Sequence, residues 1–297
     1  MRSTRLGILL AAAFVVVVLT ISVEASVTTA LSAANDARLN RRVAKMVDAV
    51  THETGRYVDT LSTIAAGLGA VPELTAAAFE QITDPAIRMK LAGATSVVYL
   101  VAIDDAHVQT EQEKWRRRGA ADLVLRPDAA SASHIFSIFS QPLKQTAPMA
   151  TGIDVAMSAP STIALMRSRD THEMTLSDPY PLAPDLAGGL PQQSFMLTAP
   201  VLGMADSSGS RRLNGWVQMG LRSGDFLAET LDTASGKGVD VTLFTTTADG
   251  DRVEVAASRP TIKGHPDLTT SADISLVGRL WWLKIAASST ALTSKRR

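Results

Sequence analysis

The first apolar segment of the chain is not interrupted by any charged residue. Residues 6–23 read LGILLAAAFVVVVLTISV, and they contain no Asp, Glu, Lys or Arg. About 18 residues in a helix rise about 27 Å, close to the ~30 Å hydrocarbon core of a bilayer. Only a helix satisfies every backbone group of such a segment in lipid. The pattern therefore predicts a transmembrane helix over 6–23.

The charges beside this segment predict its orientation. Arg2 and Arg5 precede the segment, and Glu24 follows it. Because basic residues favour the cytoplasmic side, we expect residues 1–5 to form a cytoplasmic tail and the remainder of the chain to be exported. The protein is then a single-pass protein of the cell membrane whose folded part is extracytoplasmic.

A cleaved signal peptide is the alternative interpretation of the same segment. Val23 and Ala25 are small enough to suit a cleavage site. The apolar run is longer than the usual ~7–15 residues of a signal peptide, which favours retention as an anchor. Both interpretations predict export.

The next residues, 24–70, have the periodicity of one long stalk helix. Apolar positions recur at intervals of three and four, and no proline occurs before Pro72. A narrow apolar stripe predicts either pairing with a second copy, and so a homodimer, or packing against the chain's own domains. The stripe comprises Leu39, Val43, Met46, Val47, Val50, Tyr57, Val58, Leu61, Ile64 and Leu68.

Beyond Pro72, short strand-like runs alternate with helices and with turns rich in Pro, Gly and Asp. Because no regular βαβ period is present, the pattern predicts an α+β fold with antiparallel sheets. Residues 184–193 and 203–213 are expected to be exposed loops. The expected strands are Ser96–Ile103, His134–Phe139, Ser194–Leu202, Gly215–Leu221, Val239–Phe244, Arg252–Ala256 and Leu276–Ala286, and the expected helices are Asp105–Arg118, Ala159–Ser168 and Ser223–Thr233, the last capped by Ser223.

Composition excludes several classes of function. The chain of 297 residues has 29 basic and 29 acidic side chains, so bulk charge does not favour nucleic acid as a partner. It contains no cysteine, which excludes disulfides, cysteine-ligated zinc and thiol catalysis.

Candidate catalytic residues are scattered along the chain. There is no G-x-S-x-G, Walker A or G-x-G-x-x-G motif, and the five histidines include no i,i+4 pair. Asp104 and Asp105 are adjacent, so they would point apart on a helix. The sequence does not by itself bring Asp154, Asp170 and Asp178 together. We therefore expect no catalytic residue, no metal site and no cofactor, and so no enzyme.

Several short motifs carry a resemblance to a known family. GID at 152–154 precedes a predicted helix, SDP at 177–179 forms a turn, LTAPV at 197–201 lies in a strand, and GWV at 215–217 begins another strand. In this order and spacing, over about 90–290, they resemble the CHASE domain. That domain is the extracytoplasmic sensory module of receptor histidine kinases, cyclases and diguanylate cyclases.

The resemblance implies an architecture of a long helix followed by two PAS-like antiparallel-sheet domains. Residues 71–232 would form the ligand-binding part and residues 233–297 the membrane-proximal part. The sequence departs from the family pattern at three places, one of which is the stretch KQTAPMA at 144–150, which lacks the usual asparagine before the Gly-x-Asp. His172 stands where glycine is usual after the helix, and Ser161 stands where arginine is common at the helix start.

By the same resemblance, three residues face a small-molecule ligand. Asp154 would offer a carboxylate to a polar N–H, Leu176 would line the apolar floor, and Thr198 would lie on the central strand beneath the ligand. The alternatives are a capping role for Asp154 near Ser158 and ordinary sheet packing for Leu176 and Thr198.

Receptors of this family continue into a second membrane helix and a kinase, cyclase or diguanylate cyclase domain. Residues 283–297 are too short and too polar to span a bilayer, so we expect this chain to lack its output domain and to be a fragment or a sensor that signals through a partner. The predicted function is small-molecule sensing for a downstream kinase or cyclase. An exported binding protein without a signalling role and an exported hydrolase are the alternatives.

Overall fold

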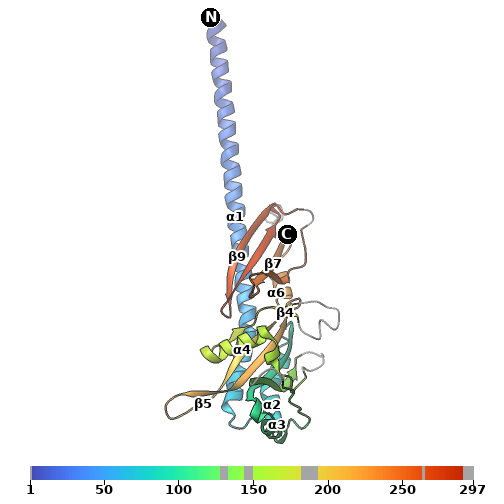
Figure 1. The fold of residues 1–297 in the computed structure, drawn as a ribbon. Helices are drawn as coiled ribbons and strands as arrows, with labels where there is room; N and C mark the ends of the chain where they lie inside the picture. The colour runs from blue at the N-terminus through green and yellow to red at the C-terminus, as the bar shows by residue number, and fades with distance from the viewer. Residues whose placement is uncertain (1, 128–132, 144–149, 182–192, 263–264, 290–297) are drawn as a thin grey trace.

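The computed structural model describes residues 2–127, 133–143, 150–181, 193–262 and 265–289, with side chains from residue 33 onward except at residue 157. Its longest element is α1 (Arg2–Ala70), one continuous helix of 69 residues that ends just before Pro72. Figure 1 shows α1 projecting far beyond the folded part at its N-terminal end. The predicted stalk helix over 24–70 is confirmed in its extent.

The predicted membrane segment 6–23 lies in the part of α1 whose side chains are not described. Among the residues whose side chains the structure describes, no helix is both long enough and apolar enough to cross a bilayer.

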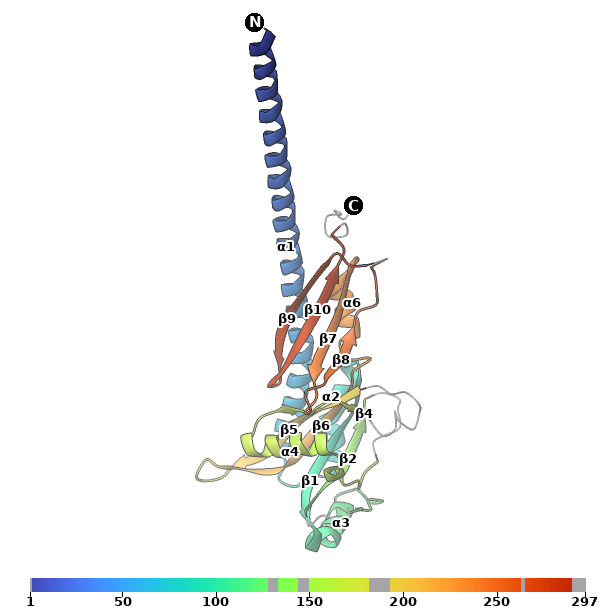
Figure 2. The same ribbon diagram turned by 45° about the horizontal axis from the view of Figure 1, so that its top comes forward.

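Two antiparallel sheets pack beside α1, as the α+β prediction requires (Figures 1 and 2). The first sheet lies along the C-terminal half of α1, and the second sheet lies nearer its N-terminal end (Figure 1). The first has the strand order β2-β1-β6-β5-β3, with β4 also paired to β5, and the second has the order β8-β7-β10-β9. The first-sheet strands are β1 (Ala94–Asp104), β2 (Ser133–Pro142), β3 (Thr175–Leu176), β4 (Tyr180–Pro181), β5 (Gln193–Ala205) and β6 (Arg211–Arg222). The second-sheet strands are β7 (Val239–Thr246), β8 (Arg252–Ala257), β9 (Leu268–Leu276) and β10 (Arg279–Ala287).

Shorter helices surround the sheets. They are α2 (Ala76–Arg88), α3 (Val108–Arg117), α4 (Ala159–Thr171) and α6 (Ala228–Ser235), with single turns η1 (Asp105–His107) and η2 (Val155–Met157). Helices α1 and α4 cover opposite faces of the first sheet. The face toward α1 belongs to the main hydrophobic core, and the face toward α4 has a smaller core that contains Leu165 of α4, Leu100 and Trp216.

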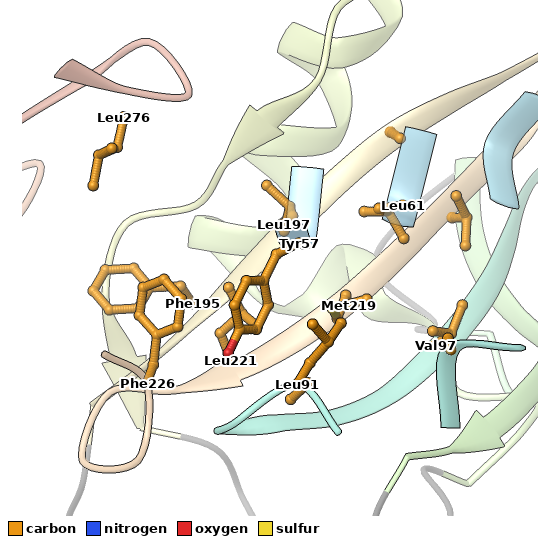
Figure 3. Close-up of a cluster of buried hydrophobic side chains, with 14 of the residues drawn as sticks. Tyr57, Leu61, Leu91, Val97, Phe195, Leu197, Met219, Leu221, Phe226 and Leu276 are labelled. Carbon is orange, nitrogen blue, oxygen red and sulfur yellow. The ribbon is translucent and has the colours of Figure 1, made fainter. Parts of the chain in front are cut away.

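The apolar stripe of α1 packs on the chain's own sheets. Tyr57 and Leu61 are fully buried, and Figure 3 shows them lying over Leu197, Met219 and Leu221 of the first sheet. The Tyr57 hydroxyl donates to the carbonyl of Ala92 at 2.7 Å. Of the two roles that the sequence left open for the stripe, the structure shows the packing against the chain's own domains.

An aromatic cluster joins the two sheets. Trp281 of β10 lies 5.3 Å from Phe195 of β5 and 6.2 Å from Phe226, and Phe226 meets Tyr57 edge-on at 5.1 Å, each between ring centroids. Beside it, Arg279 Nη1 donates to Asp178 Oδ1 at 2.6 Å, which ties the segment after β3 to the second sheet. Aromatic pairs of this kind add to the stabilisation from their buried area.

The predicted strands are confirmed except near the C-terminus. Leu276–Ala286 was expected as one strand, but Leu276 ends β9 and the chain turns back through Val277 and Gly278, both with positive φ, into β10. Exposed positions alternate regularly along β9, but its inward positions include Thr270 and Ala272, which give no strong hydrophobic pattern.

Three other expectations were wrong. The loop expected over 203–213 largely forms the ends of β5 and β6, because their backbone pairing continues to Ala205 and Arg211 beyond the apolar core. Helix α6 begins at Ala228, after Leu227 in the left-handed conformation, and not at a cap on Ser223. Helix α2 was not expected at all, and it contains Pro85. Most of the loop expected over 184–193 lies outside the described residues.

The α1 packing predicts a contrast between neighbouring residues. Leu61 is fully buried and Ser62 is exposed. Leu61→Ala leaves a cavity between α1 and the first sheet and should lower the free energy of unfolding by about 2–5 kcal/mol. Ser62→Ala should change it by less than about 0.5 kcal/mol. Urea unfolding followed by circular dichroism measures both, and equal effects would contradict the assigned packing.

Candidate functional site

The segment that carries Asp154 is fixed against β2. Gly152 has φ +78°, and a Cβ at this position would overlap the carbonyl of Val124. Single bridges join Ile153 to Arg126 and Asp154 to Phe136. Only glycine fits this close approach without strain, so the glycine of the GID motif positions the aspartate that follows it.

Buried groups of the chain itself surround the Asp154 carboxylate. Its Oδ2 lies 2.7 Å from Nδ1 of the fully buried His134. Its Oδ1 accepts from the backbone N–H of Ile135 at 3.1 Å and of Ala156 at 3.0 Å, the latter as the cap of η2. A carboxylate can only accept, so Nδ1 carries the histidine proton here. The capping role is thus present at η2, and Asp154 also orients His134.

The opposite nitrogen of His134 has no hydrogen-bond partner among the described residues. Its Nε2 lies 3.5 Å from Oδ1 of Asp105, whose side chain is 69% exposed. A buried imidazole nitrogen left unpaired costs free energy, which marks it as a candidate contact for a bound molecule.

Thr198 faces α4 from the middle of the first sheet. It is fully buried, and its Oγ1 accepts from Nε2 of Gln218 on β6 at 2.9 Å. The same amide also donates to Ser161 Oγ on α4 at 3.2 Å. Gln218 therefore bridges the sheet and the helix through Thr198 and Ser161.

Leu176 lies on the other face of the sheet from Thr198. In the β3–β5 pairing, Thr175 is opposite Thr198 and Leu176 is opposite Leu197. Thr175 donates to the carbonyl of Ala164 on α4 at 2.8 Å, whereas Leu176 packs against the main core with α1. Side chains alternate between faces along a strand, so Leu176 and Thr198 do not point into one space.

Hydroxyl groups line the interface between α4 and β5. The buried face of α4 includes Ser161 and Ser168, and the facing positions of β5 include Ser194 and Thr198. The hydroxyls of Ser168 and Ser194 have no hydrogen-bond partner within the described part of the chain. Burial also raises the pKa of the Tyr180 phenol, opposed by hydrogen bonds with Ser158 and Ser161. The interface therefore presents several buried polar groups.

Sequence reasoning missed His134, Gln218 and Tyr180. Gln218 had a readable signal, because it is a polar residue between Val217 and Met219 in an otherwise apolar strand. No comparable signal marks His134, whose partner Asp154 is twenty positions away in the sequence. Within the described residues, no group of three or more His, Asp or Glu side chains could hold a metal ion.

Two hollows lie elsewhere on the described surface. One, of about 420 Å³, lies between α3, β1, β6 and the end of α1. The other, of about 370 Å³, lies between α2 and β2. Neither is lined by Asp154, Leu176 or Thr198.

Comparison with known proteins identifies the family. The model of the CHASE domain matches residues 72–254, more than half of the chain. The chain belongs to the CHASE family. This match confirms the resemblance inferred from the sequence. CHASE domains are extracytoplasmic sensory modules and not catalysts.

The solved structures show a related fold. A chain described as methyl-accepting chemotaxis protein X superposes with a TM-score of 0.53 at 13% identity, covering 86% of this chain and 98% of that chain. Identity this low shows likeness of fold alone. No curated protein matches the sequence significantly.

His172, which stands where the resemblance to the CHASE domain leads us to expect glycine, has a backbone conformation that favours glycine. His172 follows α4 with φ 56° and ψ 23°, the left-handed conformation that ends many helices. Glycine adopts this conformation without strain, whereas another residue pays roughly 1–2 kcal/mol. The histidine therefore keeps the helix end of the CHASE fold at some cost in stability.

The contacts of Asp154 predict a large effect of its removal. Asp154→Ala leaves three buried donors without an acceptor and should lower the free energy of unfolding by about 3–5 kcal/mol. Asp170→Ala, at a side chain that is 64% exposed, is the matched control and should change it by less than about 0.5 kcal/mol. Denaturant unfolding measures the difference, and an Asp154→Ala protein as stable as the control would contradict the assigned contacts.

Proposed function

We propose that the chain is the sensory part of a membrane-anchored receptor and that it binds a small molecule between α4 and the first sheet. The observation that carries this proposal is the bridge from Gln218 to Thr198 and Ser161, in a buried interface where the hydroxyls of Ser168 and Ser194 have no partner among the described residues. A ligand with donors and acceptors would take over these hydrogen bonds and satisfy the unpaired groups. Residues 71–232 would then be the ligand-binding part and residues 233–297 the membrane-proximal part.

The two faces of the first sheet differ in how firmly they are covered. On the α1 face, Val217, Met219 and Leu221 are buried in the main core. On the α4 face, contacts between hydroxyl and amide groups accompany a smaller apolar cluster. Because net hydrogen-bond energies are small when water or a ligand can replace the partner, α4 is the element that can move at least cost.

The three predicted contacts would act in different ways. Thr198 would meet the ligand directly in place of the Gln218 amide. Asp154 would hold His134, whose Nε2 faces away from the carboxylate. Leu176 would contribute its backbone. The backbone N–H of Ser177 donates to the carbonyl of Met196 on β5. Because hydrogen-bonded and non-hydrogen-bonded positions alternate along an antiparallel pair, the N–H and C=O of Leu176 point away from β5.

Ligand binding can be measured by thermal shift with a panel of small metabolites. A ligand at 100 times its Kd should stabilise the protein by about 2.7 kcal/mol and raise the Tm by several degrees. Thr198→Val and Ser161→Ala should each lose most of this shift. Thr245→Val, the same kind of change at a buried position of β7, should retain it. A metabolite that stabilises all three variants equally would place the binding site elsewhere.

The anchor is the second part of the proposal. Residues 6–23 would cross the membrane as one helix, with residues 1–5 in the cytoplasm. The continuity of α1 from Arg2 to Ala70 supports a direct mechanical link between such an anchor and the first sheet. A displacement at α4 would be transmitted to a downstream kinase or cyclase through α1 and through the Asp178–Arg279 pair.

Dimerisation would use the outward face of α1, because the apolar stripe is occupied. Ala44 and Thr51 are exposed and lie seven residues apart, whereas Val50 is buried. The chain has no native cysteine, so an introduced cysteine is its only thiol and any disulfide must form at that position. Ala44→Cys and Thr51→Cys should form disulfide-linked dimers in membranes under mild oxidation, and Val50→Cys should not.

If Ala44→Cys and Thr51→Cys react with maleimide but do not cross-link, the homodimer through this face of α1 is refuted. If Val50→Cys cross-links as well as they do, the packing of α1 on its own sheets is refuted in the membrane.

A further inference from the structure

The hollow beside α3 lies on the other side of the first sheet from the α4 interface. It has a volume of about 420 Å³, within the range of small-molecule sites. Its floor comes from Tyr99, Ile103 and Trp115, and Leu68 in the last turn of α1 closes one end. We call it the α3 pocket. None of the residues proposed above to contact a ligand lines it.

An unpaired donor lies in the wall of the α3 pocket. Trp115 is only 4% exposed, and its indole Nε1 has no hydrogen-bond partner in the described part of the chain. The ring is held edge-on against Tyr99 and Phe139, at 6.0 and 5.7 Å between centroids. A buried N–H without an acceptor is costly, and this rigid packing does not let the indole turn toward another partner.

Arg118 adds a second donor that is weakly occupied. Its guanidinium lies 5.3 Å from the centre of the Trp115 ring. Its ion pair with Glu73 is long, at 3.5 Å, and Glu73 is 82% exposed. Arg118 also lines the pocket beside Tyr99.

The remaining charges of the α3 pocket leave an excess of donors. Lys114 and Glu111 neutralise each other at 2.8 Å. Asp104 and Arg212 are both exposed at the rim. The pocket lining therefore has more cationic side chains, Lys114, Arg118 and Arg212, than carboxylates, Asp104 and Glu111.

Apolar side chains form the rest of the wall. The apolar residues that line the pocket include Leu68, Leu74, Val101 and Leu213. An inorganic anion would leave these apolar surfaces in contact with water, whereas an organic anion would cover them.

We propose that the α3 pocket is a second binding site, for a small organic carboxylate. The carboxylate would pair with Arg118, and a short apolar chain would lie against Trp115, Leu68 and Leu74. Charge-assisted hydrogen bonds to a carboxylate are stronger than those between neutral groups. Because the pocket contacts the end of α1, its occupant would act on the same helix as the α4 site without sharing residues with it.

The indole N–H signals of the full chain in detergent micelles provide a direct test. The protein has four tryptophans, so a ¹⁵N-labelled sample has four such signals in a two-dimensional NMR spectrum, and Trp115→Phe assigns the relevant one. Titration with butyrate should shift the Trp115 signal saturably. Butylamine, which has the same chain and the opposite charge, should not shift it.

Matched variants separate the assigned contacts from general effects. Arg118→Gln should weaken the butyrate response at least tenfold. Arg117→Gln, at the exposed neighbouring position outside the pocket, should leave it unchanged. If Arg118→Gln does not fold, Arg212→Gln at the rim of the pocket is the replacement variant. Arg212→Gln should weaken the butyrate response several-fold. Thr198→Val, which tests the α4 site, should have no effect.

Three results would overturn the proposal. The first is an absence of any saturable shift of the Trp115 signal with butyrate. The second is an equal response to butylamine, or an undiminished response in Arg118→Gln and Arg212→Gln. The third is saturation with inorganic phosphate but not with butyrate, which would exclude an organic carboxylate.

Discussion

The packing of one face of α1 against both sheets is the constraint on which the rest of the structure depends. Tyr57 and Leu61 bury themselves over β5 and β6, and further toward the N-terminus Arg42 donates to the carbonyl of Ser235 at the end of α6 at 3.0 Å. A single helix thus contacts both the first sheet and the elements of the second. Because a packed core resists small deformations, the helix and the sheets that it joins behave as connected rigid parts.

This constraint divides the first sheet into two unlike faces. The α1 face is apolar and continuous with the aromatic cluster of Phe195, Phe226 and Trp281. The α4 face contains a bridging amide and several hydroxyls. A sensory module needs one part that responds and one part that transmits, and this division supplies both. If α4 has two positions on this face, a ligand can shift the equilibrium between them only by the difference in its affinity for the two.

The site was readable from the sequence only in part. The GID motif located Asp154, and the CHASE pattern located the strands that carry Leu176 and Thr198. The pattern did not show that His134 and the backbone N–H of Ile135 would occupy the Asp154 carboxylate, because both groups belong to a strand about twenty residues earlier. Nor did it show that Leu176 and Thr198 face opposite ways, since that depends on the register between β3 and β5.

Local periodicity determined the long helix, most of the strands and the α+β class, because spacings of two and three to four residues are properties of the chain itself. The apolar run at 6–23 likewise predicts an anchor from composition alone. Tertiary structure decided what each pattern is used for. The stripe that suggested a dimer packs on the chain's own sheets, β9 exists because β10 pairs with it, and Gln218 matters because α4 brings Ser161 within hydrogen-bond distance. These outcomes rest on contacts between distant segments, which no local pattern encodes.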